Sequence, residues 1–135
     1  MIRYINNEMG GNTMAIQESG EMYLETILVL SKKNNVVRAI DIAEHMGYSK
    51  PAVSRALGKL RDDKLILTDQ AGFIAFTENG RSLAEKVYRK HVLLTEFIMR
   101  LGVDEETASA DACRIEHVIS DTTFEAMIKH AKGRQ

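Results

Sequence analysis

The chain has 135 residues, enough for one compact unit or two very small ones that share a core. Its hydrophobic fraction of 44% and charged fraction of 27% are ordinary for a soluble globular protein, and no apolar run reaches the roughly 18–20 residues of a membrane span. A single cysteine excludes an internal disulfide, and the N-terminus has too short an apolar core for a signal peptide. These features favour a cytoplasmic protein.

The net charge of −1 hides an asymmetry along the chain. Residues 49–64 carry five cations against two carboxylates, a net of +3, whereas residues 104–125 carry seven carboxylates against one arginine, a net of −6. One end is therefore suited to a polyanion and the other attracts cations.

The chain begins with a polar, glycine-bearing stretch that predicts a flexible leader over residues 1–16. A first helix is expected from Ser19, which suits an N-cap, to the polar "KKNN". Its apolar positions recur with helical spacing: Met22, Tyr23, Ile27 and Leu30.

The stretch "VRAIDIAEHMGYSKPAVSRALGKLRDDKLI" predicts a helix-turn-helix. Gly47 suits the sharp turn, Ser49 can cap the second helix, and the only proline, Pro51, falls in the first turn, where its missing N–H costs little. The small Ala43 facing Val53 lets the two helices cross closely. An ordinary helical hairpin with a solvated charged face is the alternative.

The next stretch, "LILTDQAGFIAFTENG", predicts a β-hairpin around "DQAG", which would form a wing beside the second helix. A long helix is then expected from about Thr77 to Leu101, stopped by Gly102. The segments "DEETASADACRIEHVIS" and "DTTFEAMIKHAKG" predict two further helices. The expected fold is mostly α, with a winged helix-turn-helix over residues 17–82 and a helical domain over residues 83–135.

The exposed face of the second helix of this motif is the candidate DNA-binding surface. Hydroxyls and cations contact phosphates, Arg55 suits a guanine edge, and Ala52 suits a thymine methyl. Each residue is also explained singly as a solvated side chain, but the helix-turn-helix context favours DNA. The candidate residues are Arg38, Ser49, Lys50, Pro51, Ala52, Ser54, Arg55 and Lys59.

The segment "DACRIEHVISD" places Cys113, Glu116 and His117 at i, i+3 and i+4, on one face of a helix. A metal site, a nucleophile with its base, and a small buried cysteine in a core all fit this pattern. Enzyme chemistry is disfavoured because no glycine-rich loop offers Cys113 an oxyanion hole. A metal site needs further ligands, for which Met22 and Glu25 on the first helix and His91 on the long helix are available.

From Ser19 to Lys132 the chain resembles the metal-dependent repressors of the diphtheria toxin repressor and manganese transport regulator type. The resemblance rests on "EMYLETI", "DIAEHMGYSKPAVSRAL", "LTEFIMRLGVDEE" and, most specifically, "DACRIEHVISD". It implies a transcriptional repressor with a DNA-binding winged helix and a helical dimerisation and metal-binding domain. It also implies no small-molecule substrate and no membrane partner. Because the chain ends near Gln135, a two-domain form without the SH3-like domain of the iron-type members is expected.

The resemblance implies which residues hold the metal. In iron-type members the regulatory metal is bound at positions that correspond here to Met22, Cys113, Glu116 and His117. Manganese-type members instead carry an aspartate at the Met22 position and a glutamate at the Cys113 position. They share a glutamate at the Glu25 position and a histidine at the His91 position. Glu25 and His91 are therefore candidates for a second ion site or an outer-shell pair.

The ancillary metal site of the iron-type members uses the His91 position, but its other histidine and glutamate fall here on Ala110 and Thr95. That site therefore looks damaged. Thiolate and thioether ligands beside imidazole and carboxylate favour a borderline cation over Mg²⁺ or Ca²⁺. Fe²⁺ is the physiological metal expected most strongly, and Mn²⁺ is the alternative. Zn²⁺, Co²⁺ or Ni²⁺ is expected to bind in vitro.

The sequence thus predicts a repressor that binds a palindromic operator in double-stranded DNA as a homodimer when Fe²⁺ or Mn²⁺ is bound, and that controls metal-homeostasis genes. A winged-helix regulator that uses Cys113 as a thiol redox sensor and a metal-independent dimeric DNA-binding module remain as alternatives. The last two helices carry apolar residues that a small monomer is not expected to bury, and these would form the dimer contact: Ile115, Val118, Ile119, Phe124, Met127 and Ile128.

Overall fold

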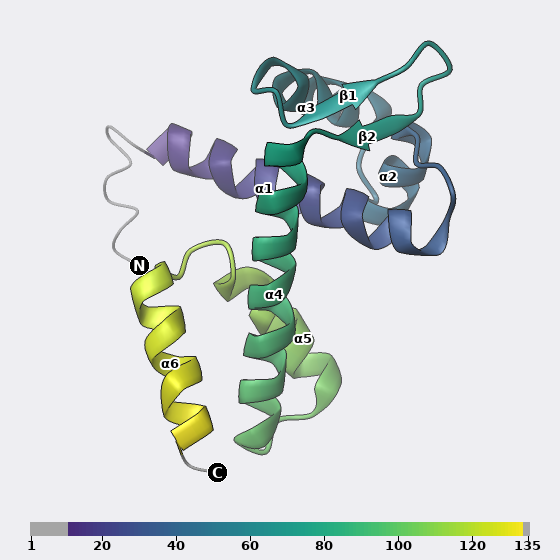
Figure 1. Ribbon diagram of the computed structural model, residues 1–135. Helices are drawn as coiled ribbons and strands as arrows, with labels where there is room; N and C mark the ends of the chain where they lie inside the picture. The colour runs from purple at the N-terminus through teal and green to yellow at the C-terminus, as the bar shows by residue number, and fades with distance from the viewer. Residues whose placement is uncertain (1–10, 134–135) are drawn as a thin grey trace. The chain divides into compact units, whose positions relative to one another are not determined.

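The computed structural model describes residues 11–133 (Figure 1). The described elements are α1 (Gly11–Lys33), α2 (Ala39–Met46), α3 (Lys50–Asp62), β1 (Ile66–Thr68), β2 (Ile74–Phe76), α4 (Glu78–Arg100), α5 (Glu105–Ile115) and α6 (Asp121–Gly133). The expectation of a mostly α chain with one small sheet is confirmed. Among the described residues, no helix combines the length and the apolar character that crossing a membrane requires.

The chain divides into two compact units between Glu85 and Lys86, inside α4. The boundary expected from the sequence lay three residues earlier, between positions 82 and 83. The first unit contains α1, α2, α3, the two strands and the start of α4. The second contains the rest of α4 with α5 and α6.

Helix α1 begins at Gly11, so the expected helix start with an N-cap at Ser19 is wrong. The residues between these positions include methionine, alanine, glutamine and glutamate, which all favour a helix and extend it toward the N-terminus. Residues 11–16, which were assigned to the leader, are therefore helical. The rest of the expected leader, residues 1–10, lies outside the described part of the chain. Leu24 and Ile27 of α1 are fully buried.

Helices α2 and α3 form the expected helix-turn-helix. Gly47 adopts the left-handed conformation (φ 73°) and donates its backbone N–H to the carbonyl of Ala43, which ends α2. The Ser49 hydroxyl accepts from the backbone N–H of Ala52 at 3.3 Å and caps α3. Val53 is fully buried and Ala43 nearly so, as expected for a close helix crossing.

The two strands form the expected antiparallel wing, with Ile66 paired to Phe76. A carboxylate oxygen of Asp69 accepts from the backbone N–H groups of Ala71 and Phe73, each at 2.9 Å, and closes the loop. Gly72 provides the positive φ (88°) that the loop requires.

Two residues hold the start of α4 against the segment just before β1. The Thr77 hydroxyl accepts from the backbone N–H of Gly80 at 3.0 Å and donates to the carbonyl of Lys64 at 2.8 Å. A Cβ at position 80 would lie 1.8 Å from the carbonyl oxygen of Leu65, so only glycine allows this close approach.

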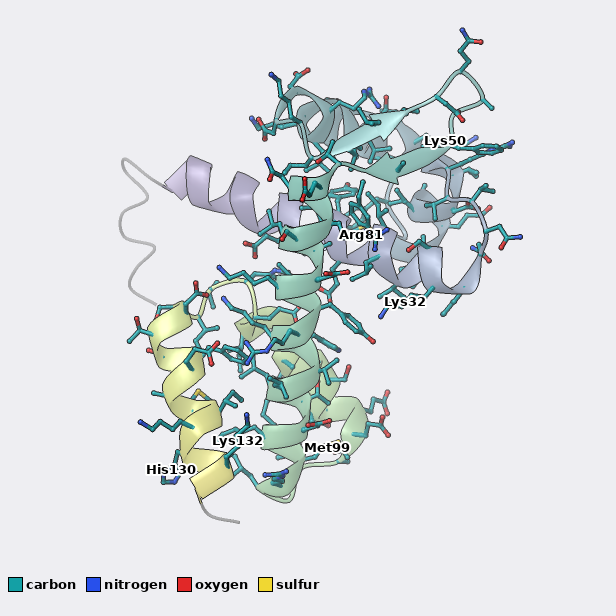
Figure 2. All side chains as sticks on the ribbon, viewed as in Figure 1. Lys32, Lys50, Arg81, Met99, His130 and Lys132 are labelled. Carbon is teal, nitrogen blue, oxygen red and sulfur yellow. The ribbon has the colours of Figure 1, made fainter. Side chains whose placement is uncertain are left out.

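The second unit is built around a small core of buried side chains from α4, α5 and α6: Leu94, Ala112, Phe124 and Ile128. Ion pairs join α4 to α6 at its surface, where the Nζ atoms of Lys86 and Lys90 lie 2.8 and 2.9 Å from the two carboxylate oxygens of Asp121. Arg89 pairs with Glu125 at 2.9 Å in the next turn of α6. Figure 2 shows His130 and Lys132 on the same helix, near its end.

This core corrects the list of residues expected to stay exposed until a dimer forms. Phe124 and Ile128 are only 1% and 6% exposed, because α6 turns them toward α4 and α5. Ile115, Ile119 and Met127 are partly buried against the same core. Val118 remains 43% exposed.

Candidate metal centre and nucleic-acid interface

The residues Cys113, Glu116 and His117 lie at the end of α5, not wholly inside it. The helix ends at Ile115, and Glu116 follows as its C-cap with helical backbone angles and an N–H bond to the carbonyl of Ala112 at 2.8 Å. The expectation that all three residues lie within a helix is therefore corrected. The near-helical conformation of Glu116 still leaves the three side chains close together.

The end of α5 follows from the residues after His117. The backbone N–H groups of Val118 and Ile119 both bond to the carbonyl of Ile115, at 3.0 and 2.9 Å, which tightens the last turn. Both residues are β-branched and favour a helix less than unbranched ones. Ser120 then begins the next helix, since its hydroxyl accepts from the N–H of Thr123 at 3.1 Å.

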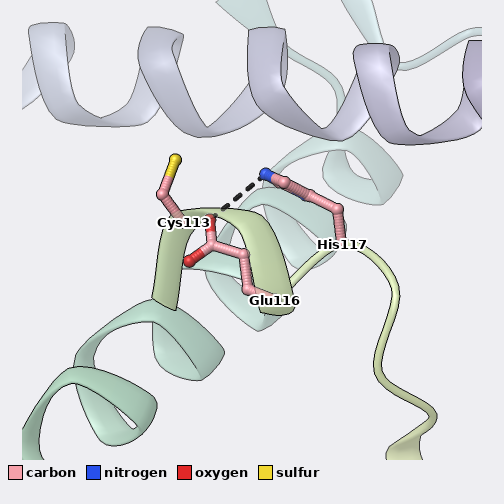
Figure 3. A group of neighbouring side chains, drawn as sticks. All are labelled: Cys113, Glu116 and His117. Carbon is pink, nitrogen blue, oxygen red and sulfur yellow. Dashed lines mark ion pairs between the residues drawn. The ribbon is translucent and has the colours of Figure 1, made fainter. Parts of the chain in front are cut away.

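The three side chains bring a thiol, a carboxylate and an imidazole together. The Cys113 sulfur, a Glu116 carboxylate oxygen and a His117 ring nitrogen lie within 4.8 Å of one another (Figure 3). The Oε2 atom of Glu116 lies 3.3 Å from Nε2 of His117, and both atoms are shielded from solvent. Cys113, by contrast, is exposed.

A second imidazole reaches the same carboxylate from α4. Nδ1 of His91 lies 2.8 Å from Oε1 of Glu116, and because an ionised carboxylate only accepts, His91 is the donor. The side chain of Glu116 is fully buried, whereas that of His91 is 22% exposed. Glu116 is therefore a buried carboxylate between two histidines.

The other nitrogen of His91, Nε2, lies 3.3 Å from the hydroxyl of Ser109, which donates to it when the ring proton is on Nδ1. Ser109 is not part of any motif recognised in the sequence. Its position four residues before Cys113, on the same face of α5, is the signal that points to it.

Neither residue expected at the other ancillary positions is a histidine or a carboxylate. The Thr95 hydroxyl donates to the carbonyl of His91 within α4 at 2.7 Å. Ala110 has no ligand atom. Within the second unit, His91 contacts Glu116 and Ser109.

The donor set suits a divalent transition metal. A buried carboxylate is costly unless positive charge or hydrogen-bond donors compensate it, and a divalent cation supplies that charge directly. Imidazole and thiolate are ligands for Fe²⁺, Zn²⁺ and similar ions, whereas Mg²⁺ and Ca²⁺ prefer oxygen ligands alone. Cys113, Glu116 and His117 therefore fit such an ion.

The remaining metal candidates, Met22 and Glu25, belong to the first unit. They lie three residues apart on α1, so they share one face of the helix, and both side chains are half-buried.

The candidate DNA contacts gather on the first unit. All are exposed except Ala52, which is half-buried. Lys50, labelled in Figure 2, occupies the first residue of α3. The Arg38 guanidinium lies over the Phe73 ring, 4.6 Å from its centroid, and so is held against the loop of the wing. A further contact, which no sequence motif indicates, joins α3 to β1: Nη1 of Arg61 donates to the Thr68 hydroxyl at 3.2 Å.

Both units match known protein families. Residues 15–71 match the model described as "Iron dependent repressor, N-terminal DNA binding domain", and residues 77–133 match "Iron dependent repressor, metal binding and dimerisation domain". The chain is 33% identical over 116 residues to the diphtheria toxin repressor of Corynebacterium diphtheriae, covering 85% of this chain and 51% of that protein. It therefore spans about half the length of that relative.

Two further relatives support the match over the length of the chain. An uncharacterised HTH-type transcriptional regulator of Methanocaldococcus jannaschii is 32% identical over 114 residues, which cover 83% of this chain and 91% of that protein. The solved structure of the manganese regulator SloR is similar with a TM-score of 0.75 at 34% identity, over 84% of this chain and 53% of that one. With its winged helix and its helical unit both matched in order, the chain belongs to the iron-dependent repressor family.

Proposed function

We propose that this protein is a transcriptional repressor that binds a palindromic operator in double-stranded DNA as a homodimer when a divalent metal ion is bound. The observation that carries the proposal is the cluster of Cys113, Glu116 and His117, which combines three metal-ligand types within 4.8 Å. The exposed, basic α3 in a winged helix-turn-helix supplies the DNA-binding half. Family membership links the two halves. The protein acts by binding, with no catalytic step and no small-molecule substrate.

The metal would be held by Cys113, Glu116 and His117, with Met22 of α1 as a fourth ligand. Support for Met22 comes from its thioether, which matches the thiol of Cys113 in softness, and from the family resemblance. Glu25 and His91 are proposed for a second ion or as partners that orient the ligands, a role that the His91–Glu116 contact of 2.8 Å supports. The bound metal supplies positive charge beside a buried carboxylate.

Fe²⁺ is the proposed physiological metal and Mn²⁺ the alternative. A thiolate and a thioether weaken the case for Mn²⁺, which is well served by oxygen and nitrogen ligands alone. Zn²⁺, Co²⁺ and Ni²⁺ should also bind in vitro, because affinities in this series follow the metal more than the site.

Metal occupancy would control DNA binding by favouring one arrangement of the two recognition helices in a dimer. Operator half-sites lie one turn of DNA apart, about 34 Å, or a multiple of it, so the spacing of the helices decides affinity. A coupling of about 1–3 kcal/mol is enough for a 5- to 150-fold change in affinity.

The test is a DNA-binding titration under anaerobic, reducing conditions. The probe is a palindromic duplex selected from a random pool with metal-loaded protein, and Fe²⁺ and Mn²⁺ are added separately. We expect affinity to rise at least fivefold with metal and to return to its starting value with a chelator. Equal affinity with and without metal would rule out a metal-activated repressor.

The exposure of Cys113 favours one second candidate, a repressor that senses oxidants through this thiol. It predicts that peroxide changes DNA affinity whereas a chelator does not. The same titration, repeated with peroxide and with a chelator in place of metal, separates the two functions.

A further inference from the structure

Helix α1 packs against the recognition helix α3. Near the C-terminal end of α3, a Cβ at Gly20 would sit 3.7 Å from a side-chain carbon of Leu60, which is ordinary packing distance. Tyr23 of α1 lies against Tyr48, two residues before α3 begins. Gly20 and Tyr23 flank Met22, the proposed metal ligand, on α1.

Tyr23 packs on the residue that leads into the recognition helix. Its side chain is buried, with 4% of the residue exposed, and its ring centroid lies 6.1 Å from that of Tyr48, with the rings inclined at 60°. Aromatic pairs favour such tilted arrangements. Tyr48 directly precedes Ser49, whose hydroxyl caps α3. The ring pair therefore fixes the first turn of α3 against α1.

Arg55 lies on the helix that this ring pair anchors. It is exposed on the outer face of α3, six residues after the cap. Tyr23 thus contacts the residue just before the cap of the helix that carries the side chain proposed to contact a base.

We propose that Tyr23 is a positioning residue that, through its ring contact with Tyr48, aims Arg55 at the DNA. The inference rests on the proposed function, because it assumes that Arg55 contacts a base edge. It adds that a buried residue of α1 sets the precision of the contact between Arg55 and the base. That residue lies next to a proposed metal ligand and far in sequence from the DNA-binding helix. Tyr23 touches neither metal nor DNA in this role.

The test is a double-mutant cycle between Tyr23→Leu and Arg55→Ala, read as affinity for the selected palindromic duplex with Mn²⁺ present. Arg55→Ala alone should weaken binding, and Tyr23→Leu alone should weaken it about tenfold, within the range for loss of one good base contact. In the Arg55→Ala background, Tyr23→Leu should cost less than about twofold, because the contact that it aims is already gone. A mixed-sequence duplex of equal length should bind Tyr23→Leu and the parent alike, because Tyr23 carries no charge.

Two results would contradict different claims, one the proposed function and the other this inference. If Arg55→Ala leaves the affinity for the selected duplex unchanged, α3 does not read the operator and this part of the proposed function fails. If Arg55→Ala weakens binding but Tyr23→Leu costs the same tenfold in both backgrounds, the proposed function stands and the inference is wrong.

Two more variants distinguish the proposed positioning role of Tyr23 from a purely structural one. Tyr23→Phe keeps the ring contact and should bind within twofold of the parent. Tyr48→Leu, at a position 44% exposed and so tolerant of change, replaces Tyr23→Leu in the cycle if the latter does not fold. It should show the same loss, and the same absence of loss in the Arg55→Ala background. Additive losses for Tyr48→Leu would overturn the inference.

Discussion

At the scale of single residues, Glu116 is the centre of the candidate metal site. One carboxylate oxygen lies 2.8 Å from His91 and the other 3.3 Å from His117, and the side chain has no exposed surface. A carboxylate in this position favours any cation that can reach it, and its burial makes the site sensitive to loss of its charge.

Replacing the ligands should therefore remove metal binding and leave the fold. Cys113→Ala, Glu116→Gln and His117→Ala should each abolish the rise in melting temperature caused by metal, because the unfolded chain cannot offer the same ligands in place. In the parent, metal at 100 times its Kd should add about 2.7 kcal/mol. Thermal unfolding with and without Mn²⁺ measures this.

The matched control for Glu116→Gln is Asp111→Asn, an acidic residue of the same helix that pairs with Arg114 at the surface. It should keep the full metal-induced shift. A parent-like shift in the Cys113 and His117 variants would exclude these residues as ligands.

Asp121 should make the second unit sensitive to acid. Hydrogen bonds from Lys86 and then Lys90 lower the pKa of its carboxyl from 3.8 to about 2. Since the folded pKa is lower than the unfolded one, the stabilisation is complete above about pH 4 and is lost as pH falls toward 2. Its side chain is 58% exposed, so solvent limits the effect to about 0.2–1 kcal/mol.

Unfolding by urea at pH 6 and at pH 3 measures this contribution. Asp121→Asn should lower stability at pH 6, with a smaller difference from the parent at pH 3. An equal difference at both pH values would show that the ion pairs contribute nothing.

Much of the candidate site could be predicted at this scale, because ligand types recur at local helical spacing. Cys113, Glu116 and His117 were found in this way, and the structure brings them together. Ser109 and the pair of Tyr23 and Tyr48 were not found. Serine and tyrosine occur mostly at positions that bind no ligand, so their presence alone predicts no site. The contact between the two tyrosines also joins segments far apart in the chain, which local spacing does not predict.

At the scale of elements, two glycines in helices have opposite roles. Gly80 of α4 meets the backbone of Leu65, and an added Cβ would lie 1.8 Å from its carbonyl oxygen. Gly58 of α3 would meet only the end of the Arg61 side chain, at 3.7 Å. The first glycine is required by packing, whereas the second only weakens a helix.

Gly80→Ala should therefore lower the free energy of unfolding by about 1–3 kcal/mol or more, since the backbone at Leu65, just before β1, must move. Gly58→Ala, the matched control, should raise it by about 0.4–1 kcal/mol. Chemical denaturation of both variants measures these values. A Gly80 variant as stable as the parent would show that α4 and the segment before β1 can separate without cost.

Lys59 lies on the recognition helix α3, where we expect it to contact a DNA phosphate. Lys59→Ala should weaken binding to all DNA sequences alike and reduce the slope of log affinity against log salt by about 1. Lys129→Ala, an exposed lysine on α6 outside the winged unit, is the control and should keep the slope. Titrations at several salt concentrations test this, and equal slopes for parent and Lys59→Ala would remove Lys59 from the interface.

Elements with strong local signals were the easiest to predict. The Gly47 turn, the Ser49 cap and the loop around Asp69 are fixed by nearby residues, and all form as expected. The sequence predicts the start of α1 too late, because Ser19 suits a cap although good helix formers precede it. The burial of Phe124 and Ile128 depends on packing between helices, which periodicity alone does not give.

At the scale of the whole molecule, the opposite net charges of residues 49–64 and residues 104–125 fit two kinds of partner. The basic α3 region suits DNA, and the acidic stretch after Gly102 suits metal cations. A palindromic target also calls for a two-fold symmetric protein.

We expect a dimer formed through the second unit, in line with the matched family description of a metal binding and dimerisation domain. Of the six apolar residues expected at the dimer contact, Val118, 43% exposed, is the most open to a partner. Val118→Glu should shift sedimentation at micromolar concentration toward monomer, because a charge would be buried at the contact. Leu67→Glu, on the exposed wing, should leave the dimer intact. A monomeric parent with metal present would exclude this assembly.

The position of Cys113 has one practical consequence. It is the chain's single cysteine, it is exposed, and its sulfur lies within 4.8 Å of ligand atoms of Glu116 and His117. A thiol-reactive dye would therefore attach once per chain, beside the candidate site. A cation that binds the thiolate should slow this alkylation, so the labelling rate alone would report site occupancy in mixtures of metals.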